Sequence, residues 1–147
     1  MANLIDEDVA GQIKEIFGQL NEPVEVLFFG KNEGCETCDD TRQLVEEVVA
    51  LSDKIEMSIH DLEGDREVAE KYSVDKAPGL VIAGRDGDRI QDYGVRYAGI
   101  PSGHEFSSFI NDLIVVSGRD SGLSQKTRDF LKGLEEPVLL QVFVTPT

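Results

Sequence analysis

The most constraining feature of the sequence is a short run, Val24 to Phe29, in which nearly every residue is apolar and many are β-branched or aromatic. Such a run suits a central β-strand that is buried on both faces. Apolar residues at helical spacing precede it, over about residues 6–19, and follow it, over about residues 38–51. A buried strand between two amphipathic helices predicts an α/β fold.

The pattern after the second helix changes to strands and turns. Residues 55–60 alternate apolar and polar, which predicts a strand, and a short helix is expected near residues 66–72. The Asp-Gly pair at residues 86–87 lies between two strand-forming runs and predicts a hairpin. Ser102 and Glu105 have the spacing of a capping box that starts a closing helix. This order of elements predicts a thioredoxin-like fold, with a mixed central sheet flanked by helices.

The composition excludes several classes of protein. The 147 residues suffice for one domain or slightly more, and 40% hydrophobic with 29% charged residues is ordinary for a globular chain. No apolar run approaches the roughly 18 residues of a membrane span, and the first residues lack a secretory signal. We therefore expect a cytoplasmic protein that does not bind membranes.

The net charge of −15 argues against nucleic acid as a partner, because 29 acidic residues outnumber 14 basic ones. Two interpretations of this charge stay open. It either only keeps the protein soluble, or it steers basic surfaces of partner proteins towards this one.

The chain has two cysteines, Cys35 and Cys38, at the junction of the expected strand and helix. In a reducing compartment such a pair is more often catalytic or metal-binding than structural. Unpaired N–H groups and the dipole at a helix N-terminus favour the thiolate. We therefore predict thiol–disulfide exchange on protein disulfides, with Cys35 as the attacking thiolate and Cys38 as the resolving thiol.

Further residues are expected to complete this site. Pro78 follows Ala77 at the start of a strand, where we expect a cis peptide bond beside the sulfurs and a backbone that pairs with substrate peptide. Gly34, Glu36 and Thr37 adjoin the cysteines and are expected to tune their reduction potential. The predicted chemistry uses the two sulfurs alone, so we expect no cofactor and no metal.

Four acidic residues stand close to the cysteines in sequence, namely Glu33, Glu36, Asp39 and Asp40. Their charge opposes formation of the thiolate, and strong oxidants depend on a very stabilised thiolate. We therefore expect a reductase or a protein of intermediate potential. The alternative is that the four acids are solvated surface groups with little influence.

The end of the chain repeats its beginning. Residues 129–143 align with residues 15–29 at an offset of 114. The repeat predicts one unit over residues 1–118 and, over residues 119–147, a linker, helix and strand that begin a truncated second unit. Residues 138–144 should pack on the first unit or pair with a second chain as a homodimer. The alternative is an ordinary C-terminal helix and strand that only resemble the first ones.

Several motifs resemble one protein family: Gly34-Cys-Glu-Thr-Cys38, Ala77-Pro78, the run from Arg96 to Phe106, and the ending Val142-Phe-Val-Thr-Pro-Thr147. Over the whole chain the sequence is similar to the glutaredoxin-like protein disulfide oxidoreductases of archaea and thermophilic bacteria. In that family two thioredoxin-like units lie in tandem. The resemblance implies reduction, oxidation or isomerisation of protein disulfides, with a thioredoxin-reductase-like flavoprotein as electron donor.

The sequence also departs from this family. Glu36-Thr37 replaces the Pro-Tyr of the more active C-terminal site, which implies a weaker unit or a redox relay to a second unit. Ala77 replaces the Thr or Val often found before the proline of glutaredoxins, which argues against glutathione. The flavoprotein component of alkyl hydroperoxide reductase is a tandem relative, but its first unit generally lacks the cysteine pair, so the pair here argues against it.

Three other hypotheses are weighed against redox catalysis. Zinc could take Cys35, Cys38, His60 and His104, but the two histidines are 44 residues apart, whereas structural zinc sites use short spacings. An iron–sulfur cluster shared between two chains is the second hypothesis. A thioredoxin-like module that binds partners without catalysis is the third.

Overall fold

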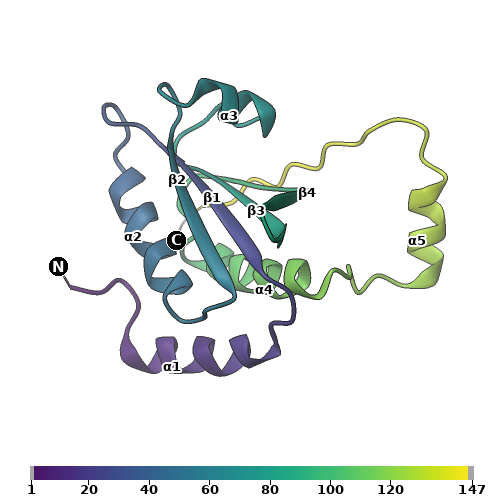
Figure 1. Ribbon diagram of the computed structural model, residues 1–147, viewed down its shortest axis with the longest axis horizontal. Helices are drawn as coiled ribbons and strands as arrows, with labels where there is room; N and C mark the ends of the chain where they lie inside the picture. The colour runs from purple at the N-terminus through teal and green to yellow at the C-terminus, as the bar shows by residue number, and fades with distance from the viewer. Residues whose placement is uncertain (1, 146–147) are drawn as a thin grey trace.

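The centre of the molecule is a four-stranded mixed sheet in the order β2-β1-β3-β4 (Figure 1). The computed structural model describes residues 2–145, so Met1, Pro146 and Thr147 lie outside it. Strand β1 pairs in parallel with β2 and antiparallel with β3, which pairs antiparallel with β4. This topology confirms the predicted thioredoxin-like sheet. The strands are β1 Val24–Gly30, β2 Ile55–Asp61, β3 Gly79–Asp86 and β4 Arg89–Ala98.

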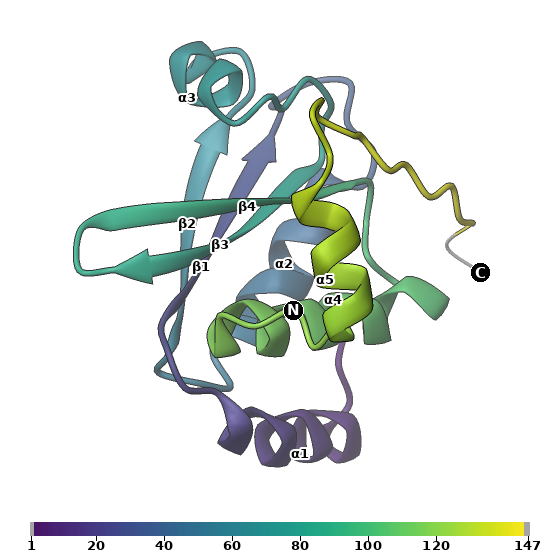
Figure 2. The same ribbon diagram turned by 90° about the vertical axis from the view of Figure 1, so that its right-hand side faces the viewer.

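Helices cover both faces of this sheet (Figures 1 and 2). Helices α1, α2 and α4 contribute to the apolar core on one face, and α3 contributes to the core on the other. Among the described helices, none is both long and apolar enough to cross a membrane. The helices are α1 Glu7–Ile16, α2 Cys38–Val49, α3 Arg66–Lys71, α4 His104–Gly118 and α5 Gln125–Lys132, with a 3-10 turn at Phe17–Gln19.

Every residue of β1 is buried, as its apolar composition predicts. Val24, Val26 and Phe28 point into the core formed with α1, α2 and α4, whereas Leu27 and Phe29 point into the core beneath α3. Each large apolar side chain buried in this way contributes about 1.5–3 kcal/mol to stability. The strand therefore joins the two cores.

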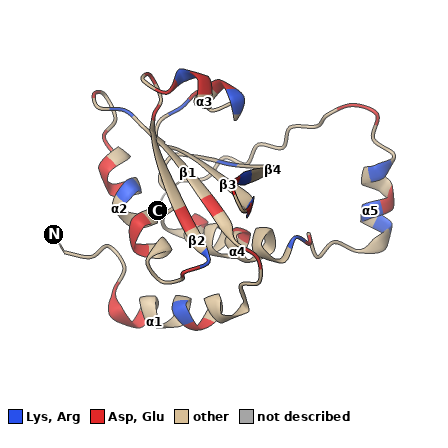
Figure 3. Cartoon of the chain, viewed as in Figure 1, with Lys and Arg blue, Asp and Glu red and all other residues tan. Residues whose placement is uncertain are grey.

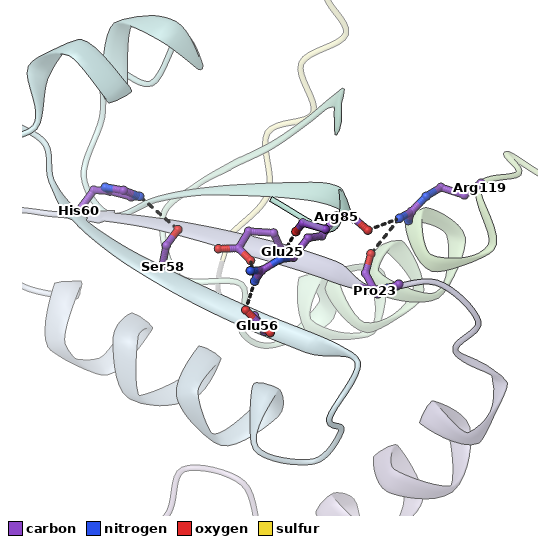
Figure 4. Close-up of polar contacts among 8 residues, drawn as sticks. Pro23, Glu25, Glu56, Ser58, His60, Arg85 and Arg119 are labelled. Atoms are coloured by element: carbon purple, nitrogen blue, oxygen red, sulfur yellow. Dashed lines mark hydrogen bonds and ion pairs between the residues drawn. The ribbon is translucent and has the colours of Figure 1, made fainter. Parts of the chain in front are cut away.

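One buried residue of β1 is charged. The carboxylate of Glu25 lies 3.2 Å from Nη1 of Arg85, which also forms an ion pair with Glu56 (Figure 4). Beside it, the Arg119 guanidinium donates hydrogen bonds to the carbonyls of Pro23 and Arg85 at 3.0 and 3.1 Å. A carboxylate that is buried away from water, as that of Glu25 is, needs a positively charged partner such as Arg85. The periodicity of the sequence gave no sign of this network.

The predicted capping box at the start of α4 is wrong. The helix begins at His104, and Gly103 occupies the N-cap position with a φ of 62° and no side-chain cap. This left-handed turn places Ser102 outside the helical path, so its hydroxyl does not cap the helix. The backbone amide of Glu105 instead donates to the Ser102 carbonyl at 3.3 Å.

The strand expected over residues 138–144 is not formed. Helix α5 is present, but residues 133–145 contain neither helix nor strand, and α5 projects from the rest of the chain (Figure 1). Leu140 is 86% exposed and Phe143 is 89% exposed, so the expectation that this segment packs on the first unit is also wrong. An apolar run becomes a strand only when a neighbouring strand takes up its backbone hydrogen bonds. Residues 138–144 have no such neighbour within the described chain.

Candidate redox site

The two cysteines lie where β1 passes through a loop into α2. Cys35 is in the loop, Cys38 is the first residue of the helix, and their sulfurs form a disulfide with a Cα–Cα distance of 5.5 Å. Cys38 is 4% exposed and belongs to the core, whereas Cys35 is half-buried at its margin. Cys35 is therefore the more exposed residue of the pair, which agrees with the predicted roles.

The start of α2 is fixed by two threonines. The Thr37 carbonyl accepts hydrogen bonds from the backbone N–H of Thr41 at 2.9 Å and from the Thr41 hydroxyl at 2.6 Å. Thr41 is fully buried, so this double contact holds the first helical turn against the core. The helix therefore begins at Cys38, with its first N–H groups and its positive dipole end towards the cysteine loop.

The register of the sheet brings Pro78 to the same corner. Phe29 and Gly79 form the last pair of the antiparallel ladder, so Pro78 and Gly30, the last residue of β1, both lie just beyond it. A Cβ atom on Gly30 would lie 3.9 Å from Sγ of Cys38. The Ala77–Pro78 peptide bond is cis, as the sequence predicts. Ala77 packs against the same core as Cys35.

The run from Arg96 to Phe106, which carried the family resemblance, links this corner to α4. The backbone N–H of Gly99 donates to the Pro78 carbonyl at 2.9 Å. Gly99 has a φ of 104°, which favours glycine, and the following Pro101 is fully buried. The Tyr97 hydroxyl donates to the Asp112 carboxylate at 2.5 Å. The motif therefore shapes the chain around Pro78.

The three residues expected to tune the site are exposed or half-buried. Gly34 lies in the left-handed region with a φ of 71°, Glu36 is exposed between the cysteines, and Thr37 is half-buried at the helix N-cap. Figure 3 shows acidic residues at the loop before α2 and in its first turn. All four acids near the cysteines are exposed, and within residues 2–145 none of them forms an ion pair. Their charge is therefore not neutralised by the chain.

The two histidines do not form a metal site with the cysteines in the described chain. The His60 ring stacks on Phe29 with centroids 5.0 Å apart, and its Nε2 lies 3.1 Å from the Ser58 hydroxyl (Figure 4). Phe29 belongs to the core beneath α3, on the opposite face from Cys38. His104 is exposed at the start of α4. Over residues 2–145, no three or more His, Cys, Asp and Glu side chains are grouped to hold a metal ion.

Sequence reasoning missed three residues of this site. A Cβ on Gly30 would contact Cys38, Thr41 holds the first turn of α2 through the Thr37 carbonyl, and Asp112 accepts a hydrogen bond from Tyr97. A glycine at the end of an otherwise bulky strand and a threonine four residues after Thr37 were the available signals. Nothing local connects Asp112 with Tyr97, because the contact depends on how α4 packs against β4.

The geometry agrees with a known family, since the sequence pattern of the thioredoxin domain matches residues 23–111. The chain belongs to the thioredoxin-domain family. A component of the Staphylococcus epidermidis alkyl hydroperoxide reductase is 31% identical over 145 residues, which cover 98% of this chain and 25% of that protein. A protein named NADH dehydrogenase from Bacillus subtilis is 30% identical over 145 residues, with the same coverage. The chain thus spans about a quarter of the length of the curated relatives it matches.

A solved structure supports the same assignment. The protein disulfide oxidoreductase from Aeropyrum pernix K1 superposes with a TM-score of 0.77 at 27% identity, covering 90% of this chain and 57% of that one. This match confirms the resemblance to disulfide oxidoreductases. Components of alkyl hydroperoxide reductases match as well. The expectation that Cys35 and Cys38 exclude this enzyme as a relative is therefore wrong.

We predict that Gly30→Ala destabilises the fold by about 1–3 kcal/mol, because overpacking a close contact has a cost of that size. The added Cβ would meet the Phe28 ring at 2.8 Å. Gly11→Ala is the matched control, because nothing lies within 4 Å of its Cβ position in α1, and it should stabilise the helix by about 0.5–1 kcal/mol. Urea denaturation of both variants measures the difference. Equal stability of the two variants would contradict the packing at Gly30.

Proposed function

We propose that this thioredoxin-like domain reduces protein disulfides through Cys35 and Cys38. The observation that carries the proposal is the disulfide at the strand–helix junction, with Cys35 at the margin of the core and Cys38 within it. The similarity to a protein disulfide oxidoreductase supports it. The alternative is a module that binds partners, or passes electrons to a second unit, without reducing substrates itself.

The reaction follows from the position of the sulfurs. In the reduced domain, the Cys35 thiolate attacks one sulfur of a substrate disulfide, forming a mixed disulfide and releasing the other substrate sulfur as a thiolate that takes up a proton. The Cys38 thiolate then attacks Sγ of Cys35. This step releases the second substrate thiol and leaves the Cys35–Cys38 disulfide. Two electrons pass from the domain to the substrate in each turnover.

The surroundings of the sulfurs supply the other roles in the proposal. The backbone at Ala77 and Pro78 would receive the substrate peptide as an added strand, a role supported by its position just before β3, whose first residue pairs with Phe29 of β1. Gly34, Glu36 and Thr37 would set the reduction potential through the loop conformation, a negative charge and the start of α2. These residues are the ones that a substrate cysteine would meet first.

The direction and the electron donor are also proposals. The unpaired acids at the site oppose a strongly stabilised thiolate, which favours reduction over oxidation. The relatives named NADH dehydrogenase and alkyl hydroperoxide reductase support a flavoprotein as the donor of electrons. A reducing compartment such as the cytoplasm would keep the cysteine pair in its active dithiol form.

We further propose that residues 119–147 begin a second thioredoxin-like unit. At the repeat offset of 114, exposed apolar residues of this segment correspond to core residues of the first unit, as Leu140 does to Val26 and Val142 to Phe28. Their sequence has the pattern of a strand, but they form none in the described chain. An unpaired apolar strand sequence tends to find another strand edge, and a second copy of this chain offers one.

Cysteine variants test the activity. Insulin reduction should fall to the uncatalysed background in Cys35→Ser, because the attacking sulfur is lost. Cys38→Ser should accumulate a mixed disulfide with substrate, because Cys35 can attack but nothing resolves the product. Mass spectrometry under non-reducing conditions detects that adduct. Failure of the unmodified dithiol domain to reduce insulin would favour the binding module.

The direction is tested by the pH dependence of thiol alkylation. In the reduced domain, the reaction of Cys35 with iodoacetamide should have its midpoint well above pH 5, because the surrounding acids offset part of the helix dipole effect. Glu36→Gln should lower that midpoint, and Glu7→Gln, at the distant start of α1, should leave it unchanged. A midpoint below about 5 would instead indicate a strong oxidant.

The second-unit proposal predicts self-association of the 147-residue chain. Sedimentation equilibrium should show a dimer at high concentration, because burying residues 138–144 removes apolar surface from water. The pair Leu140→Lys and Val142→Lys should yield a monomer. Leu4→Lys, at a 48% exposed residue of the N-terminal segment, should still dimerise. A parent chain that stays monomeric over a roughly hundredfold range of concentration would contradict the proposal.

A further inference from the structure

One contact between the sheet and α4 lies beside the corner that holds Pro78. The Tyr97 hydroxyl donates to Asp112 of α4 at 2.5 Å, and the Tyr97 ring meets the buried Phe109 ring edge to face, with centroids 5.8 Å apart. Both partners stand on the same helix, one turn apart. Tyr97 therefore ties the end of β4 to α4 through one hydrogen bond and one ring contact.

This tie is next to the last backbone contact of β4. Tyr97 pairs with Leu80 and Ala98 with Gly79, and the N–H of Gly99 then donates to the Pro78 carbonyl at 2.9 Å. After Gly99 the chain leaves the sheet towards α4. Tyr97 thus stands two residues before the amide that bonds the Pro78 carbonyl.

Strand β4 needs such a tie because it is an edge strand. It pairs with β3 alone, and the register of that pairing shifts between Ile82 and Ala83. An edge strand has backbone hydrogen bonds on one side only, so its end separates from the sheet more readily than a central strand does. At Tyr97, side-chain contacts with α4 add to those backbone bonds.

We propose that Tyr97 and Asp112 are positioning residues for protein substrates: their hydrogen bond holds β4 against α4 and so keeps the Pro78 backbone in place to receive a substrate peptide. The inference rests on the proposed disulfide reduction at Cys35 and Cys38. Neither residue touches the sulfurs in this scheme. Their effect falls on substrates that use the peptide-binding edge, and small disulfides are reduced as before.

The hydroxyl is suited to a permanent donor role. Burial, the hydrogen bond to Asp112 and the negative charges of Asp112 and Glu105 raise the pKa of Tyr97 above its ordinary value. Burial also raises the pKa of Glu105 in the first turn of α4. The Tyr97 hydroxyl therefore keeps its proton, and with it the hydrogen bond, at neutral pH.

The experiment compares two tyrosines of the same strand. Tyr97→Phe removes the hydroxyl and keeps the ring against Phe109, so the fold is retained. Tyr93→Phe is the matched control, because Tyr93 is 46% exposed on β4 and its hydroxyl donates to the Gln91 side chain at 2.9 Å. The substrates are insulin, as a protein disulfide, and 5,5′-dithiobis(2-nitrobenzoic acid), as a small disulfide.

The expected result is a change for the protein substrate alone. Tyr97→Phe should raise the KM for insulin about fivefold, the effect of one lost hydrogen bond, and leave the rate with the small disulfide within about twofold of the parent. Hydrogen exchange of the Gly99 amide should quicken about tenfold in Tyr97→Phe. Tyr93→Phe should match the parent in all three measurements.

Variants of Asp112 complete the test. Asp112→Ala should raise the KM for insulin as much as Tyr97→Phe does. The double variant should have no higher KM than either single variant. Asp112→Asn should have a KM close to that of the parent, because its amide oxygen still accepts the hydrogen bond. If Tyr97→Phe leaves both KM and the exchange of Gly99 unchanged, the positioning role is wrong. If it slows both substrates equally, the residue acts on the sulfurs and the proposal is also overturned. A parent protein that reduces neither substrate disproves the proposed function itself.

Discussion

Burial of β1 on both faces is the constraint on which the rest of the structure depends. The strand lies between β2 and β3, and its side chains alternate between the core of α1, α2 and α4 and the core beneath α3. A strand fixed on both faces cannot slip by one residue, because a slip would exchange the two sets of side chains. Its end at Gly30 is therefore fixed in space, and the cysteine loop starts from a defined point. The same register places Gly30 and Pro78 just beyond the last pair of the ladder, Phe29 with Gly79.

The two ends of β1 carry different chemistry. At the C-terminal end, Gly30 leaves room for Phe28 and Cys38, and the disulfide closes the loop above them. Towards the other end, Glu25 is buried with Arg85 as its partner. About five residues of strand, or roughly 17 Å, separate the two. The buried carboxylate of Glu25 is thus paired with Arg85 at a distance from the sulfurs.

Local patterns predicted the elements and the cysteine site because each is encoded within a few residues. The run from Val24 to Phe29, the cysteine spacing and the Asp-Gly turn are of this kind. The contact of Tyr97 with Asp112 joins residues of different elements, so no local sequence pattern predicts it. The strand predicted over residues 138–144 did not form for the same reason. The segment has an apolar pattern like that of β1, but a strand also needs a neighbouring strand to pair with.

The electrostatic balance at the sulfurs then follows from the sheet and the helix together. The N-terminus of α2 favours a thiolate, and the exposed acids, of which Glu36 lies between the cysteines, oppose it. Because those acids are exposed, solvent screens them, whereas the N–H groups of the first helical turn are fixed by the contact of Thr41 with the Thr37 carbonyl. The helix effect is thus permanent and the acid effect varies with ionic strength. Under the proposed reduction of disulfides, a thiolate of half-buried Cys35 formed under these opposed effects would be moderately stabilised, which suits donation of electrons to a substrate disulfide.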